Sequence, residues 1–137
     1  MKQLTVSAVA PRLIAELLTP DRAAQEEIYR RSDLDPALLD NIDSRISCED
    51  FQRFAAIATD TSPDPHFGLE ATASFFPSVL DVVSFTMLAS ATLMQALETL
   101  AKYSPIIDES AEITLRRDAS VVWLIAKLRL GALLQKS

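Results

Sequence analysis

Acidic side chains crowd the stretch DLDPALLDNIDSRISCED, residues 33–50, and carboxylates at this density could bind a calcium ion. Six of its eighteen residues are Asp or Glu. A calcium loop needs oxygen ligands at its first, third and fifth positions, glycine at its sixth and glutamate at its twelfth. Counted from Asp33, the fifth, sixth and twelfth positions are Ala37, Leu38 and Ser44. The ligand spacing therefore fails, and we predict no metal site here.

A second acidic stretch, DTSPDPHFGLEA, fails the same test when it is counted from Asp60. Pro65 stands where the loop needs glycine, and Ala71 stands where it needs glutamate. We expect the acids of both stretches to cap helices instead, because a side-chain oxygen before a helix accepts hydrogen bonds from its first N–H groups. No metal and no other cofactor is predicted for this chain.

Residues suited to nucleophilic catalysis are scarce. The chain has one histidine, His66, and one cysteine, Cys48. A nucleophile needs a base within reach, and the position of His66 just after a predicted helix cap favours a surface or helix-entry histidine. Cys48 is next to a predicted helix N-cap, where the dipole could lower its thiol pKa, although a buried, inert cysteine is the commoner case. Only Gly68 and Gly131 are glycines, so no glycine-rich phosphate loop can form, and we predict that this chain is not an enzyme.

Large apolar side chains in the second half of the chain are candidates for lining a ligand pocket. Pockets in helical domains are lined mostly by apolar and aromatic side chains, with a few polar groups. The candidates are Phe85, Met87, Tyr103 and Trp123. The same residue types fill ordinary protein cores, so both interpretations stay open at these positions.

Length and composition are those of one soluble globular domain covering residues 1–137. The hydrophobic fraction is 49% and the charged fraction 23%. A single cysteine allows no internal disulfide, which fits the cytoplasm, and no apolar run approaches the length of a membrane span. The net charge is -6 and the basic residues are scattered. We therefore expect this chain by itself to bind neither nucleic acid nor membranes.

Several residue pairs predict where helices begin. Thr19-Pro20, Asp35-Pro36 and Asp64-Pro65 each put an N-cap acceptor before a proline at the first helical position. Ser47 with Asp50, and Thr92 with Gln95, have the spacing of a capping box. The apolar residues 78–90 indicate a central helix that is buried on most sides, and the helix after Thr92 is expected to end before Pro105.

Near residue 111 the apolar residues change from helical spacing to strict alternation with polar residues. In AEITLRRD, Ile113 and Leu115 alternate with polar residues, which indicates a strand, and Asp118 begins a turn. VVWLIAKLRL follows as a second strand, one end of which is expected to be covered on both faces. The predicted fold is α+β and mostly α, with five to seven short helices packed together over residues 5–107 and a β-hairpin over residues 111–130.

The hairpin and the tail after it indicate a larger domain. A lone two-stranded hairpin is only marginally stable, and Leu133 and Leu134 have no obvious burial in so short a chain. We therefore expect this chain to be part of a larger domain that is truncated at its C-terminus, either because the sequence is a piece of a longer protein or because the protein is naturally shortened.

The order of these segments resembles the N-terminal effector-binding domain of AraC-family transcription regulators, in the group whose domain is called arabinose-binding-like. The resemblance covers residues 6 to about 130 and is carried by DLDPALLDNIDSRIS, DPHFGLEA and SATLMQALETLAKYSPII, with a hairpin after them. Family members read close to Gly-Leu-Asp-Pro-x-Leu-Leu in the first motif, and commonly have glycine or alanine where this chain has Ser32. The further strands and the two DNA-binding helix-turn-helix units of the family are not in this sequence.

That resemblance implies a bacterial, cytoplasmic transcription regulator that senses a small-molecule effector, can form a homodimer, and binds DNA through a C-terminal region outside this chain. The family motifs do not define the ligand residues or the effector. The competing hypothesis is a helical dimerisation or protein-interaction module without a small ligand, which the apolar tail and the unpaired hairpin edge motivate.

Overall fold

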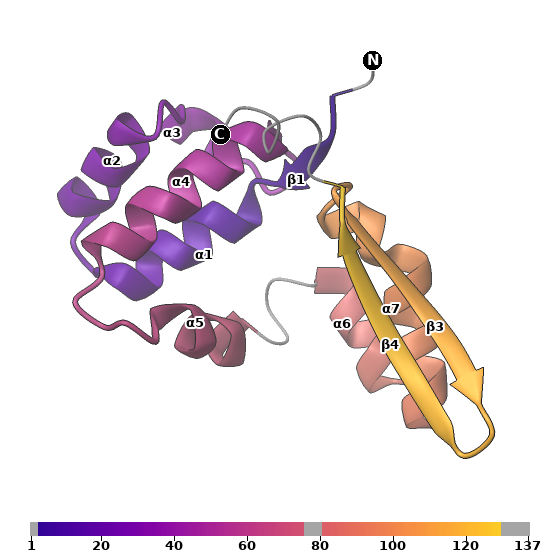
Figure 1. Cartoon of the computed structure of the whole chain (residues 1–137). Coiled ribbons are helices and arrows are strands. Elements are labelled where there is room, and N and C mark those ends of the chain that lie inside the picture. Colours follow the sequence, from indigo (N-terminus) through magenta and orange to yellow (C-terminus); the bar gives the residue numbers. More distant parts are fainter. Residues whose placement is uncertain (1–2, 76–80, 130–137) are drawn as a thin grey trace.

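The computed structural model of the chain describes residues 3–75 and 81–129. Within these residues the fold contains seven helices and four strands (Figure 1). In chain order they are β1 (Thr5–Ser7), α1 (Val9–Leu18), α2 (Arg22–Arg31), α3 (Pro36–Leu39), β2 (Arg45–Ser47), α4 (Cys48–Thr61), α5 (Phe67–Phe75), α6 (Asp81–Leu88), α7 (Leu93–Ile107), β3 (Ala111–Asp118) and β4 (Val121–Leu128). The predicted fold, mostly helical with a C-terminal β-hairpin, is confirmed.

Residues 3–75 form a unit that we call the N-terminal lobe. Its helices α1, α2 and α4 pack against one another around an apolar core (Figure 1). Phe54 of α4 is completely buried in this core, and its ring stacks on Tyr29 of α2 with 6.1 Å between the ring centroids. Ile28 and Leu39 are buried in the same cluster. Removal of these side chains from water is the main force that holds the helices together.

A small antiparallel sheet of β1 and β2 lies at the edge of the N-terminal lobe. Val6 pairs with Ile46 in the centre of the sheet, and both side chains are buried. The sequence analysis did not predict this sheet, because three residues per strand are too few to show an alternating pattern. β1 also pairs through Val6 with Asp108, which follows α7.

Three of the predicted helix caps are confirmed. The Asp35 carboxylate accepts a hydrogen bond from the Ala37 N–H, with Pro36 at the first helical position. The Ser47 hydroxyl accepts from the Asp50 N–H at 3.0 Å and donates to the Asp50 carboxylate at 2.7 Å. Thr92 begins α7 in the same way, by accepting from the Gln95 N–H.

Two predicted helix starts are displaced by about half a turn. α2 begins after Asp21, not after Thr19, because the Asp21 carboxylate accepts from the Ala23 N–H while Thr19 ends α1. Asp is the better N-cap residue of the two. Asp64 accepts from the His66 N–H at 2.8 Å, but this bond closes a turn, and α5 begins one residue later.

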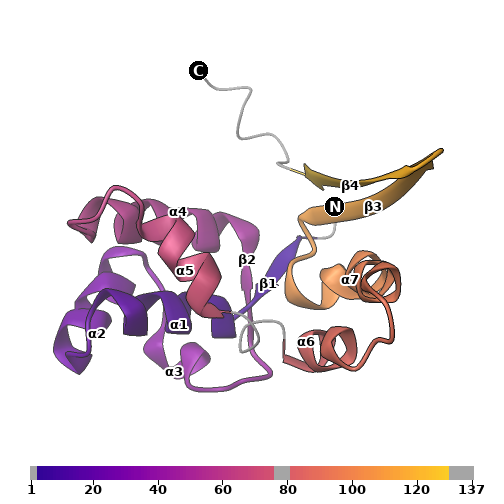
Figure 2. The same ribbon diagram turned by 90° about the horizontal axis from the view of Figure 1, so that it is seen from below.

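Residues 81–129 form the C-terminal lobe. Seen from below, the lobe has three layers, with α6 packed on one side of α7 and the β3–β4 hairpin on the other (Figure 2). The hairpin pairs Ala111 with Leu128 at its base and Asp118 with Val121 at its tip. α7 is therefore the central element of this lobe.

α7 continues through Pro105 to Ile107, which corrects the expectation that the helix ends before the proline. A proline inside a helix removes one hydrogen bond but does not always end the helix. The last turn of α7 is held from outside, because the Ile106 carbonyl accepts a hydrogen bond from Arg45 of the N-terminal lobe.

Burial in the C-terminal lobe is lower than the sequence predicts. In α6 only Val83 and Ser84 are buried among the residues whose side chains the structure describes, whereas Val82, Phe85 and Leu88 are exposed. The prediction of a helix buried on most sides is therefore wrong over this part, because α6 contacts α7 through one face alone; residues 78–80 lie outside the described residues.

The side chains of β4 are also less buried than the sequence predicts. Its side chains are exposed apart from the half-buried Ile125, so neither end of the strand is covered on both faces by the described residues. Leu133 and Leu134 lie outside the described residues. In the described parts of the chain, no helix combines the length and the apolar character needed to cross a membrane.

Candidate functional site

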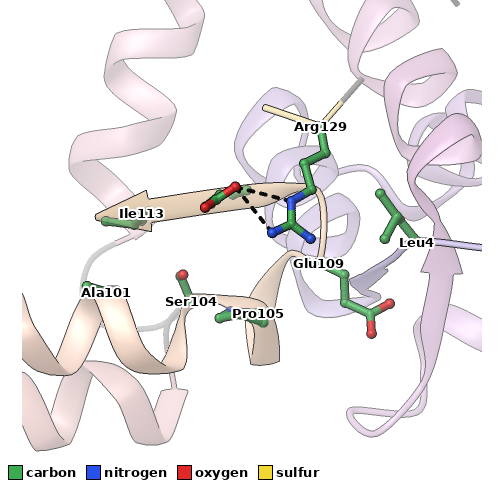
Figure 3. Close-up of a pocket in the computed structure, with 9 residues that line it drawn as sticks. Leu4, Ala101, Ser104, Pro105, Glu109, Ile113 and Arg129 are labelled. Carbon is green, nitrogen blue, oxygen red and sulfur yellow. Dashed lines mark hydrogen bonds and ion pairs between the residues drawn. The ribbon is translucent and has the colours of Figure 1, made fainter. Parts of the chain in front are cut away.

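A pocket of about 310 Å³ lies where the two lobes meet, at the base of the hairpin (Figure 3). Its wall consists of the last turns of α7, the loop that leads to β3, the first residues of β3, and the residues just before β1 and just after β4. This volume is at the lower end of the range for small-molecule sites. The pocket therefore suits a compact ligand.

The α7 side of the pocket presents polar atoms that lack their usual partners. Ser104 is 4% exposed, and its hydroxyl group has no hydrogen-bond partner among the residues that the structure describes. Pro105 has no N–H, so the carbonyl of Ala101 receives no α-helical hydrogen bond. In Figure 3 the Ser104 oxygen points away from its helix toward β3. Leaving a buried polar atom unpaired costs free energy, so a ligand or water that pairs with this hydroxyl is stabilised there.

The hairpin side of the pocket carries an ion pair. Arg129, just after β4, contacts the Glu112 carboxylate of β3 through Nε at 3.3 Å and Nη2 at 3.2 Å (Figure 3). The Arg129 side chain is 61% exposed and that of Glu112 is 44% exposed. Ion pairs as exposed as this one contribute little to stability. A ligand can therefore replace either partner at low cost.

Glu109 joins the pocket to the first strand of the chain. One of its carboxylate oxygens accepts hydrogen bonds from the Thr5 N–H at 2.9 Å and the Thr5 hydroxyl at 2.8 Å. The Glu109 N–H donates in return to the Thr5 carbonyl at 2.9 Å. These three bonds connect residues that are 104 positions apart in the sequence.

Arg45 of β2 reinforces the same junction. Its guanidinium donates to the Thr5 hydroxyl at 2.6 Å, to the Thr5 carbonyl at 3.1 Å and to the Ile106 carbonyl at 2.6 Å. One side chain thus connects β2, β1 and the last turn of α7. We call the set of Thr5, Arg45, Ile106 and Glu109 the interlobe clamp.

Cys48 lies beside the clamp and is not an activated nucleophile. Its thiol is 3.9 Å from a carboxylate oxygen of Asp108, which also accepts two bonds from Ser110 at 2.7 and 2.6 Å. Burial raises the pKa of the Cys48 thiol, and the Asp108 charge raises it too, against a lowering by the hydrogen bonds with Ser110. The suggestion that a helix dipole lowers this pKa is therefore wrong.

The four predicted pocket residues lie on three elements and are not among the residues that line this pocket. Phe85 of α6 is 64% exposed, Trp123 of β4 is 50% exposed, Tyr103 of α7 is 37% exposed, and Met87 is half-buried. Arg116 stacks over the Trp123 ring at 5.5 Å. Their part in ligand binding stays a prediction.

His66 is an exposed residue in the turn that precedes α5, the helix-entry position that its spacing from Asp64 predicts. Within residues 3–75 and 81–129, no three residues of the types His, Cys, Asp and Glu gather as a metal site would require. The acids of residues 33–50 have other partners there: Asp33 pairs with Arg53, and Asp40 pairs with Arg22.

Sequence reasoning missed the residues that line the pocket. Ser104, Glu109, Glu112 and Arg129 are individually unremarkable polar residues, and the junction of two lobes that assembles them leaves no sequence motif. Pro105 was the available signal. A proline within an otherwise regular helical pattern marks a carbonyl group without its helical partner, and a buried polar group without a partner calls for an explanation such as a bound ligand or water.

Comparison with known families gives one match over most of the chain. The family described as the arabinose-binding domain of AraC transcription regulators, N-terminal, matches residues 23–136. No curated protein matches the chain.

Proposed function

Starting from the fact that this chain belongs to the family of N-terminal arabinose-binding domains of AraC transcription regulators, we propose that it senses a small-molecule effector in the pocket at the hairpin base. In this proposal the regulator is cytoplasmic, and it contacts DNA through a region outside this chain. The domain carries the sensing step and no catalytic step.

The observation that carries the proposal is the unpaired hydroxyl of Ser104 in the pocket wall. A buried hydroxyl without a partner costs about 1–3 kcal/mol, and a ligand that pairs with it removes this cost on binding. The interlobe clamp lies against the same pocket through Glu109. Leu4 of the N-terminal lobe also lines the pocket, so a bound ligand can contact both lobes. Such contacts are needed if binding is to change how the two lobes are arranged.

A thermal-shift screen with amino acids, sugars, fatty acids and nucleotides tests this function. A ligand that binds the folded chain raises its melting temperature through mass action. We expect Ser104→Ala to weaken the response to any hit, whereas Ser84→Ala leaves it unchanged. Ser84 is a matched control, because its hydroxyl is also buried without a partner but does not line the pocket. Silence across the panel, or equal effects of both variants, would count against the proposal.

The predicted ligand residues can be tested with the same hits. Trp123 is the only tryptophan of the chain, so its fluorescence reports changes at β4 without labelling. We propose that Phe85, Met87, Tyr103 and Trp123, which lie on α7 and on the elements on both sides of it and not in the pocket at the hairpin base, also contribute to effector binding. A hit that leaves Trp123 fluorescence unchanged, and whose affinity Phe85→Ala does not alter, would exclude this contribution.

The alternative function is dimerisation or partner binding without a small ligand. It is favoured by the exposed apolar side chains of α6 and β4, among them Phe85, Leu88 and Leu128. Sedimentation equilibrium over a wide concentration range tests it. A strict monomer would count against this alternative, and a dimer that Leu128→Glu dissociates would favour it.

A further inference from the structure

We propose that the pocket at the hairpin base selects ligands that carry a protonated amine, and that Ser104, the Ala101 carbonyl and Glu112 are the acceptors of that ammonium group. This inference rests on the proposed function, since it assigns a chemical class to the effector of the same pocket. Figure 3 shows Ser104 on the α7 side of the pocket and Arg129 on the hairpin side, and Arg129 pairs with Glu112 of β3.

The hydrogen-bonding groups of the pocket are mainly acceptors. Ala101 offers a carbonyl that Pro105 has deprived of its helical donor. Ser104 offers an oxygen with two lone pairs, and both Ala101 and Ser104 line the pocket. An ammonium group has three N–H donors and no acceptor, so one such group satisfies several of these atoms at once.

The charges of the pocket lining point to the same class. Among the described residues, the lining contains two carboxylates, Glu109 and Glu112, and one guanidinium, Arg129. The nearby Arg45 is not among the lining residues, and its hydrogen bonds go to Thr5 and Ile106. A carboxylate-bearing ligand would place its charge among acceptors, whereas an ammonium is attracted by the Glu112 carboxylate.

The effect of removing the Arg129 charge distinguishes an amine ligand from an anionic one. The guanidinium and an incoming ammonium compete for the same Glu112 carboxylate, and the exposed Arg129 side chain can turn into solvent. Removal of the Arg129 charge therefore favours an amine ligand, whereas removal of the Glu112 charge disfavours it. For an anionic ligand both effects are reversed, because Arg129 would then be the attracting group.

The pocket also has an apolar surface that a hydrocarbon part of the ligand can contact. Ala111 and Ile113 of β3 and the ring of Pro105 line it together with Leu4. We therefore expect a short hydrocarbon part next to the amine. The volume of about 310 Å³ suits a compact molecule and not an extended chain.

The experiment compares matched amines, alcohols and carboxylates built on the same linear, branched and phenyl-bearing carbon skeletons, with the full chain and isothermal titration calorimetry. At least one amine should bind about tenfold or more tightly than its alcohol and carboxylate counterparts. Glu112→Gln and Ser104→Ala should each weaken amine binding several-fold, Arg129→Met should strengthen it, and Ser84→Ala should leave it unchanged. Circular dichroism melting of each variant verifies that it is folded.

The possible outcomes distinguish a wrong ligand class from a wrong binding site. Binding of an alcohol or carboxylate that depends on Ser104, with no preference for the amine, would retain the pocket as the sensing site and overturn the amine class. Weaker amine binding in Arg129→Met would also overturn it. If no probe of any charge class binds in a manner that depends on Ser104, the proposed site itself is refuted, along with the function assigned to it.

Discussion

At the scale of single residues, the hairpin tip contains a backbone conformation that alanine tolerates poorly. Ala119 has φ of 44°, and it is the first of the two residues that connect Asp118 to Val121. A positive φ at this position is typical of the type II′ turn, where glycine is preferred because it has no Cβ. The left-handed region costs other residues roughly 1–2 kcal/mol.

Ala119→Gly should therefore stabilise the chain by about 0.5–1 kcal/mol, once the greater freedom of glycine in the unfolded chain is subtracted. Urea unfolding followed by Trp123 fluorescence measures the change in the free energy of unfolding. Ser120→Gly is the control, because Ser120 is not in the left-handed region and should lose stability. A loss of stability in Ala119→Gly would contradict the turn assignment.

Cys48 provides a prediction for pH. Because burial raises its thiol pKa, less thiolate is present in the folded than in the unfolded chain. We expect iodoacetamide to alkylate the folded chain at pH 8 more slowly than the urea-unfolded chain. The same shift affects stability, because the thiol of the unfolded chain loses its proton at a lower pH than the thiol of the folded chain. The free energy of unfolding should therefore fall as pH rises from the unfolded thiol pKa, about 8.5, toward the folded value. Faster alkylation of the folded chain would contradict the raised pKa.

At the scale of elements, the sequence predicted the features that depend on residues close together in the chain, such as helix caps. Ser47, Asp35 and Thr92 cap helices as expected because their acceptors bond to N–H groups two or three residues away. The pairing of β1 with β2 could not be predicted in this way, since it depends on residues about forty positions apart. The exposed faces of α6 and β4 were mistaken for buried ones, because apolar composition does not specify which neighbour covers a face.

The cap of α4 allows a direct test. Ser47→Ala should lower the free energy of unfolding by about 1 kcal/mol, because it removes the acceptor of the Asp50 N–H and the donor to its carboxylate. Ser47→Thr retains the hydroxyl and should recover most of this loss. Chemical denaturation of both variants measures the difference. Equal stability of Ser47→Ala and the parent chain would show that the capping box contributes nothing.

At the scale of the whole molecule, the interlobe clamp determines how the lobes are joined. Arg45→Ala removes one hydrogen bond across the junction, to the Ile106 carbonyl, and two hydrogen bonds that hold Thr5 of β1 within the N-terminal lobe. Hydrogen–deuterium exchange should show the Glu109 amide opening more readily by roughly 1–3 kcal/mol, with the amides around Phe54 unchanged. Arg22→Ala is the matched control, because Arg22 forms ion pairs within the N-terminal lobe only. Uniformly faster exchange in Arg45→Ala would indicate global destabilisation and not a loosened junction.

The bonds between Thr5 and Glu109 also have a consequence for biosynthesis. The partners of Thr5 are translated in two stages, first Arg45 and later Glu109, which leaves the ribosome 104 residues behind it. The N-terminal lobe can thus form its core during translation. The hydrogen bonds between Thr5 of β1 and Glu109, which follows α7, form only later. Formation of the proposed ligand pocket is accordingly a late event in the folding of the nascent chain, and a nascent chain that stops before Glu109 would have a folded N-terminal lobe without this pocket.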